Sequence, residues 1–130
     1  MARLLIALGG ALALFAQAPG QAAAQDVAQG RTVFQANCAL CHMAASNGHS
    51  MIGPNLWGVV GRHAGSVAGF AYSPAMQHAT ITWTADQLSA FVQAPTHVVP
   101  GTRMPFAGLH NPQQASALVA YLGSLNAAGH

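Results

Sequence analysis

The sequence contains no lysine and no glutamate, and its only acidic residues are Asp26 and Asp86. Arginines are its only permanent cations, so the chain carries a formal net charge of just +2 at neutral pH. A strongly basic face, which nucleic-acid-binding proteins use to neutralise phosphates, is therefore excluded. We expect no nucleic-acid partner.

A hydrophobic run long enough to cross a membrane is also missing. The uncharged, mostly apolar residues 4–16 fall short of the roughly 20 residues that a membrane-spanning helix requires. They follow Arg3 and precede Ala22 and Ala24, which stand in the A-x-A arrangement of a cleavage site. This pattern predicts a secretory signal peptide over residues 1–24 and export to the periplasm. An uncleaved signal would tether the protein to the membrane, and no stable insertion is otherwise expected.

Cysteine is scarce, with Cys38 and Cys41 as the only two in the chain. They lie in residues 25–130, a length that suits one domain with one hydrophobic core. An oxidising compartment favours disulfides, but a bond between these two cysteines would close only a tiny loop and stabilise little. A structural disulfide is therefore a poor explanation of the pair.

Helix signals alternate with long glycine-rich loops. Short helices are predicted over residues 26–37, 74–79, 85–94 and 112–125, with capping residues Asp26, Ser73, Thr84 and Asn111. The glycine-rich stretch that follows Cys41 is far longer than loops normally are in compact domains. The sequence thus predicts an all-α domain of about four helices, with something other than secondary structure ordering its loops.

Cys38, Cys41 and His42 form the pattern C-x-x-C-H, for which we considered three chemistries. Thiol–disulfide exchange uses C-x-x-C, but on a βαβ fold that this sequence does not show. A structural zinc site needs four ligands, and no second pair follows at zinc-finger spacing. In covalent haem attachment each thiol adds to a vinyl group and the histidine binds the iron. The spacing favours one haem c, whose flat apolar ring would also order the loops.

Several segments, in this order, resemble those of class I cytochromes c. They are GxxxF at Gly30 and Phe34, CALCH, GPNLWGVVGRHAGSVAGFAYS, ITW, VPGTRMPFAGL and LVAYL. The resemblance runs from about residue 26 to 125 and implies the small, single-domain cytochrome c fold around one covalent haem. It also implies that Gly30 and Phe34 meet Leu118 and Tyr121, where the first helix crosses the last.

The function that the resemblance implies is electron transfer, not enzymatic catalysis. The protein would be a monomeric one-electron carrier in a respiratory or photosynthetic chain. Its electron donor would be a quinol–cytochrome c reductase or a dehydrogenase. Its acceptor would be an oxidase, a reductase or a reaction centre. Contacts with such redox complexes should be small and short-lived.

The resemblance also implies a set of cofactor-binding residues. Met104, in GTRMPFAGL, would be the second axial ligand opposite His42, and the carbonyl of Pro54 would bond the other nitrogen of that imidazole. Arg62, Tyr72, Trp83 and Thr102 would be donors to the haem propionates. Without the resemblance, core packing is the simpler interpretation of the two aromatic residues. A gas sensor or peroxidase would instead need Met104 to detach readily from the iron.

Two departures from the family are visible. Phe91 and Met76 stand where the family often carries a tyrosine and an asparagine joined through a buried water, so that network should be absent. In mitochondrial relatives a ring of lysines docks acidic partners, whereas this chain has histidine or arginine at several such places: His49, His63, His97, Arg103 and His110. Neutral variation on a solvated face explains them equally well. Our hypothesis is a docking ring that becomes cationic as the pH falls through the ordinary imidazole pKa of about 6.5.

Overall fold

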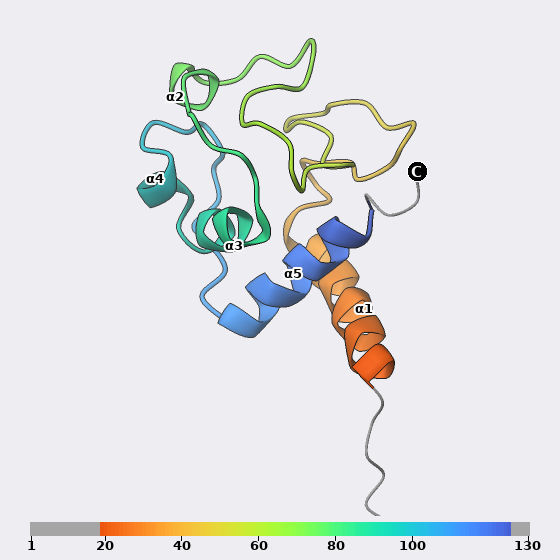
Figure 1. Cartoon of the computed structure of the whole chain (residues 1–130). Coiled ribbons are helices and arrows are strands. Elements are labelled where there is room, and N and C mark those ends of the chain that lie inside the picture. The colour runs from red at the N-terminus through yellow and green to blue at the C-terminus, as the bar shows by residue number, and fades with distance from the viewer. Residues whose placement is uncertain (1–18, 126–130) are drawn as a thin grey trace, which may run out of the picture.

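The computed structural model describes residues 19–125, so residues 1–18 of the predicted signal peptide lie outside the described part. Five helices are present: α1 (Pro19–Asn37), α2 (Pro74–Gln77), α3 (Ala85–Gln93), α4 (Pro95–Val98) and α5 (Pro112–Ser124) (Figure 1). Residues 19–125 contain no strand, only an isolated bridge between His63 and Thr82. The predicted all-α class is confirmed.

Helix α1 begins at Pro19, so the predicted start at Asp26 is wrong. Alanine and glutamine, which dominate residues 21–25, have high helix propensity, and this stretch extends the helix outward without burying a side chain. Only Gly30, Val33 and Phe34 of α1 are buried. None of the helices within residues 19–125 is both long enough and apolar enough to cross a membrane.

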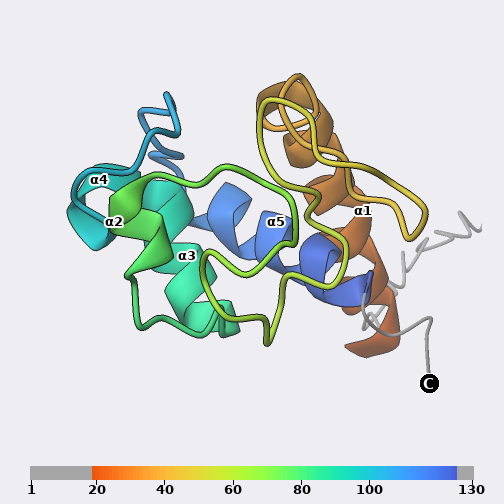
Figure 2. The same cartoon turned by 90° about the horizontal axis from the view of Figure 1, so that it is seen from above.

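Helix α5 crosses α1 at a glycine, and α3 packs on its other side (Figure 2). A side chain at Gly30 would overlap the carbonyl oxygen of Ala117 and lie 2.7 Å from Cβ of Tyr121. Next to this point the rings of Phe34 and Tyr121 pack with centroids 5.6 Å apart. The predicted contact between the first and last helices is confirmed for Gly30, Phe34 and Tyr121.

Three side-chain caps begin helices where the sequence predicts them. Ser73 accepts a hydrogen bond from the backbone N–H of Met76, and Thr84 accepts one from that of Gln87. Asn111 caps α5 by accepting bonds from the backbone of Gln113 and Gln114. The short α4 was not predicted. Pro95 ends α3, as expected, but it also starts α4, because proline suits the first position of a helix.

Side chains hold the long loop between α1 and α2 in place. The amide of Asn55 donates hydrogen bonds to the carbonyl oxygens of Ala45 and Gly48, at 2.9 and 3.0 Å. The guanidinium of Arg62 donates to the carbonyl oxygens of Trp57 and Asn55, both at 3.0 Å. These bonds satisfy loop backbone groups that would otherwise need secondary structure or water. The loop consequently has a defined shape, and it runs from the end of α1 across the domain to α2 (Figure 1).

The helix crossing gives a first testable prediction. Replacing Gly30 with alanine inserts a Cβ into the Ala117 carbonyl, and we expect the free energy of unfolding to fall by about 2 kcal/mol or more. Gly123→Ala is the matched control in α5. Its Cβ would lie 3.9 Å from Val60 Cγ2, an ordinary contact, so the better helix propensity of alanine should stabilise by about 0.5 to 1 kcal/mol. Chemical denaturation followed by circular dichroism measures both, and equal effects would contradict the close crossing.

Candidate functional site

The loops and helices enclose a cavity of about 400 Å³. It lies between the end of α1, the long loop, α3 and the loop that precedes α5. All the predicted site residues line it: Cys38, Cys41, His42, Pro54, Arg62, Tyr72, Trp83, Thr102 and Met104. The structure therefore gathers on one cavity residues that are spread over more than half of the described chain.

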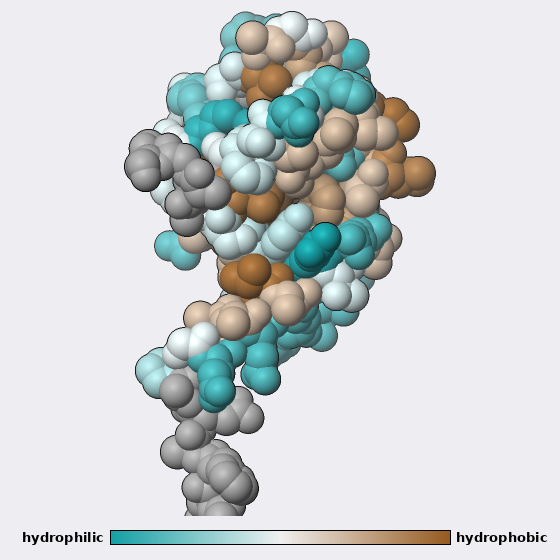
Figure 3. All heavy atoms as spheres, turned by 90° about the vertical axis from the view of Figure 1, so that its right-hand side faces the viewer, coloured by the Kyte–Doolittle hydropathy of each residue, from teal (hydrophilic) through white to brown (hydrophobic). Residues whose placement is uncertain are grey.

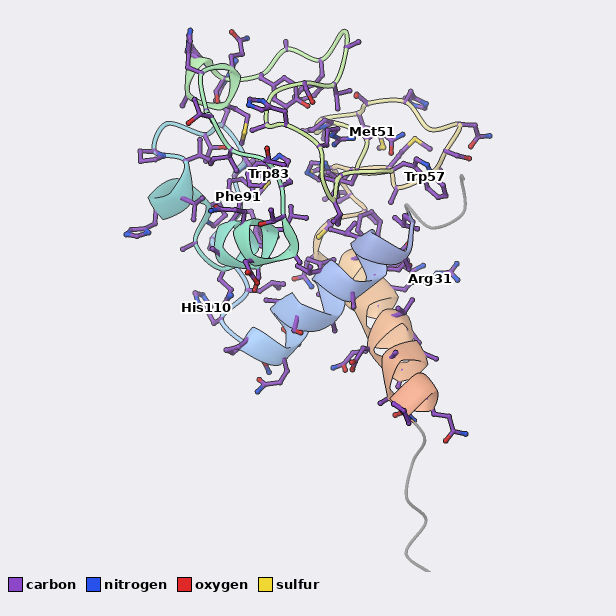
Figure 4. The ribbon with its side chains drawn as sticks, viewed as in Figure 1. Arg31, Met51, Trp57, Trp83, Phe91 and His110 are labelled. Carbon is purple, nitrogen blue, oxygen red and sulfur yellow. The ribbon has the colours of Figure 1, made fainter. Side chains whose placement is uncertain are left out.

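Most of the remaining wall is apolar. It is made by side chains of the long loop, α3 and α5: Leu56, Val59, Leu88, Phe91, Val92, Leu118 and Leu122. Trp83 and Phe91 pack their rings 4.9 Å apart on this wall and are seen together in Figure 4. Concave, largely apolar sites with a few polar groups are typical of cofactor binding. A flat, apolar macrocycle matches this wall.

Both cysteines lie on a single turn that continues from α1. The backbone N–H groups of Cys41 and His42 donate to the carbonyl oxygen of Cys38 at 3.0 and 2.9 Å, which holds the motif in a compact shape. Burial, with a smaller contribution from Cys41, raises the pKa of the Cys38 thiol to about 11. A disulfide oxidoreductase needs a nucleophilic cysteine with a lowered pKa, so the environment of Cys38 opposes that function.

The imidazole of His42 is oriented by the backbone that follows it. Nδ1 lies 2.7 Å from the carbonyl oxygen of Pro54, which can only accept, so Nδ1 carries the proton. Burial lowers the pKa of His42 and outweighs the opposing effect of this hydrogen bond, so the ring is neutral. In a neutral imidazole protonated at Nδ1, the Nε2 lone pair is available to a metal. His42 could therefore hold a metal ion through Nε2.

Gly53 packs directly against this imidazole. A Cβ at Gly53 would overlap Cε1 of His42 and lie 2.6 Å from Nδ1. The backbone N–H of Gly53 also donates to the carbonyl oxygen of Cys41 at 2.8 Å, which ties the loop to the cysteine turn. The sequence reasoning missed Gly53, although its place directly before Pro54 was a usable signal. Only glycine leaves room for the ring here.

Met104 reaches the cavity from the loop between α4 and α5. Its backbone N–H lies 3.4 Å from the Thr102 hydroxyl, and its carbonyl accepts a bond from Phe106 at 2.9 Å. Arg103 donates to the carbonyl oxygen of Tyr72 at 2.7 Å, which joins this loop to the segment before α2. The cavity contains a second methionine, Met76, which is buried in α2.

Several residues that line the cavity offer donors that suit carboxylates. Trp83 is only 6% exposed, and within residues 19–125 its indole N–H makes no hydrogen bond with a protein group. Leaving such a buried donor unpaired costs about 1 to 3 kcal/mol, so an acceptor on a bound group fits it. Burial lowers the pKa of Arg62, yet a guanidinium stays charged in proteins. The hydroxyl of Tyr72 accepts a bond from the backbone of Val67 at 3.3 Å.

The proposed docking-ring residues have mixed surroundings. His49, His63, His97, Arg103 and His110 are all exposed. Arg103, however, is engaged with Tyr72, and His63 lines the cavity. Within the described chain, no three histidine, cysteine or acidic side chains come together as a metal-binding group.

Comparison with known proteins decides the family, because the sequence model of the cytochrome c family matches residues 27–126. The chain belongs to the cytochrome c family. Cytochrome c2 of Blastochloris viridis is 41% identical over 118 residues, covering 91% of this chain and 92% of the relative. Cytochrome c of Chlamydomonas reinhardtii is 42% identical over 111 residues, covering 85% and 96%. Cytochrome c2 of Rhodopila globiformis is 40% identical over 106 residues, covering 82% and 99%.

Membership in the cytochrome c family settles the chemistry of the C-x-x-C-H motif. The protein is a c-type monohaem electron carrier and not an enzyme, and Cys38 and Cys41 fit the covalent attachment of haem c. The cavity residues fit this cofactor, because they combine apolar walls, two thiols, a neutral imidazole and an unpaired indole donor. Thiol–disulfide exchange and structural zinc no longer explain the motif.

The contact between Gly53 and His42 gives a second prediction. In the haem-containing protein, Gly53→Ala should push the imidazole away from Pro54 and lower the free energy of unfolding by about 2 kcal/mol. Thermal unfolding followed at the main haem absorbance band measures the loss, with Gly123→Ala as the control that adds a methyl group elsewhere. An unchanged melting curve for Gly53→Ala would show that the ring does not depend on this packing.

Proposed function

We propose that this protein is an exported one-electron carrier whose single haem iron is bound by His42 and Met104. The observation that carries the proposal is that both side chains line the same apolar cavity. They come from distant parts of the sequence, because His42 precedes α2 and Met104 follows α4. His42 is held neutral, with Nδ1 bonded to Pro54, and Met104 supplies a thioether.

These residues explain why the site favours electron transfer over catalysis. When bound, the haem supplies an iron that changes its oxidation state by one electron. His42 and Met104 would both hold the iron, so the iron would have no free position for a substrate. A thioether ligand from Met104 would favour the reduced iron and so raise the reduction potential. The apolar wall keeps water from the iron, which reduces the rearrangement that accompanies each electron transfer.

The same residues suggest how the propionates would be held. Trp83, Thr102 and Tyr72 offer an indole and two hydroxyls at the cavity wall, and Arg62 adds a positive charge. Carboxylates taken partly out of water require such donors. Because Arg62 also holds the long loop through Trp57 and Asn55, it would couple the shape of that loop to the cofactor.

We place the protein in the periplasm, with residues 1–24 as its signal peptide. The apolar run and the A-x-A pattern support this location. There it would act as a monomer that carries electrons from a quinol–cytochrome c reductase or a dehydrogenase to an oxidase, a reductase or a reaction centre. The intact mass of purified protein tests the cleavage, because a full-length mass would exclude it.

Met104 gives the decisive test of the ligand assignment. Met104→Ala should abolish the near-infrared sulfur-to-iron absorption band and let the reduced protein bind carbon monoxide stoichiometrically, because one axial position opens. Met76→Leu is the matched control, since Met76 lines the same cavity and leucine conserves its volume. It should keep the band and exclude carbon monoxide. If the band is lost in Met76→Leu and kept in Met104→Ala, the iron ligand is Met76 and the proposed assignment to Met104 is wrong.

Arg62 gives a prediction about the potential. Arg62→Gln should lower the reduction potential by tens of millivolts, because removing a positive charge beside the haem makes electron gain less favourable. Arg31→Gln removes the same charge from an exposed position on α1, where the side chain points outward (Figure 4), and should shift the potential far less. Spectroelectrochemical titration measures both. Equal shifts would contradict a special role of Arg62.

A further inference from the structure

Three large hydrophobic side chains are exposed beside the cofactor site. Leu40 is 83% exposed, Ile52 71% and Met51 45%. Burying such side chains is normally favourable by about 1.5 to 3 kcal/mol each, so their exposure needs an explanation when they occur together. We call these three residues the apolar collar.

A backbone hydrogen bond joins the two segments that carry the collar residues. Leu40 stands between Cys38 and Cys41, and the carbonyl of Cys41 accepts a hydrogen bond from Gly53, the residue after Ile52. Met51 in turn donates to the carbonyl of Gly53 at 2.8 Å, which closes the turn that presents Ile52. Figure 4 labels Met51 on the long loop, and Figure 3 shows hydrophobic side chains on the surface of the domain above α1.

One collar residue, Ile52, reaches the cavity. Ile52 lines the cavity together with both cysteines, yet most of its side chain is exposed. The cysteines are the points at which the edge of the haem is attached. A partner that covers the collar would therefore meet the edge of the cofactor, where the path for an electron between two proteins is shortest.

The chain around the collar carries almost no charge. Residues 32–61, between Arg31 and Arg62, include no lysine, arginine, aspartate or glutamate. Of the two histidines in this segment, His42 lines the cavity and only His49 is exposed. A partner face rich in charges would lose hydration on this segment and gain few ion pairs. The charge distribution favours a partner face that is itself apolar and nearly uncharged.

The size of the collar indicates a transient contact. Three side chains expose an area on the order of a few hundred Å², whereas a stable complex buries roughly 800 Å² on each partner. A second copy of the chain held only through the collar would therefore not form a lasting dimer. Weak encounters of this size are typical of electron-transfer proteins.

We propose that the apolar collar, Leu40, Met51 and Ile52, is the surface on which this cytochrome meets a redox-protein partner with an apolar, nearly uncharged contact face. Association is then driven by the burial of apolar surface and depends little on salt. This inference rests on the proposed function and identifies the partner's surface chemistry for the same haem site.

The test uses the haem-containing protein on gold electrodes coated with methyl-terminated or carboxylate-terminated alkanethiol layers, which stand for an apolar and an acidic partner face. All measurements are made at one fixed pH of about 8, so that salt concentration is the only variable. We expect reversible voltammetry of bound protein on the methyl layer. Its affinity should stay within about twofold between about 0.01 M and 0.1 M salt, over which the screening length falls from about 30 Å to 10 Å.

Substitutions of similar size separate the collar from the rest of the surface. Leu40→Gln and Ile52→Thr should each weaken binding to the methyl layer about fivefold, and the double variant should weaken it further. Ala90→Ser, at an exposed position of α3, makes a small polar change elsewhere and should leave binding unchanged. The haem absorbance spectrum of each variant verifies that the fold and the cofactor are intact.

Several results would overturn the proposal. Unchanged methyl-layer binding in both collar variants would do so, as would binding confined to the carboxylate layer with a steep salt dependence. Collar-dependent binding to phosphatidylcholine vesicles would assign the surface to a membrane, and a collar-dependent stable dimer in sedimentation would assign it to a second copy. A mediated redox titration in solution distinguishes failure of the proposed function from failure of the docking surface. Loss of a one-electron couple in that titration refutes the proposed function. An intact couple, together with collar variants that bind the methyl layer as tightly as the original protein, refutes only the docking surface.

Discussion

The structure depends on a cavity that the protein encloses but does not fill with its own side chains. Leu118 and Trp83 belong to the hydrophobic core and at the same time form the cavity wall, so core packing and cofactor binding share one surface. A domain with so little regular structure would otherwise bury too little apolar area to order its loops. The haem c of this family supplies that missing area, which explains how short helices and long loops form a defined fold.

The loops are held by few side chains, and those side chains also face the site. Arg62 bonds two carbonyl groups of the long loop and lines the cavity, and Arg103, in the loop that carries Met104, bonds the carbonyl of Tyr72 in the segment before α2. With no lysine or glutamate in the chain, few charged side chains remain to bind elsewhere. The near absence of charge is matched by exposed apolar side chains in and near the cysteine turn.

Much of this arrangement could be predicted from local sequence, and the failures have physical causes. The caps at Ser73, Thr84 and Asn111 act within one helical turn, so their patterns were sufficient. Pro95 was ambiguous because the same residue can end one helix and begin the next. The early start of α1 comes from helix propensity alone, which competes with the capping signal of Asp26.

The sequence by itself determined the attachment chemistry, because the spacing of Cys38, Cys41 and His42 sets the geometry of a single turn. It also determined the helix caps and the absence of charge between Arg31 and Arg62. Only the tertiary structure decided that Gly53 packs on the imidazole, that the Trp83 indole has no hydrogen-bond partner within residues 19–125, and that a backbone bond joins the segments of Leu40 and Ile52. Those features depend on contacts between segments that are distant in the chain, and residue type and spacing do not specify such contacts.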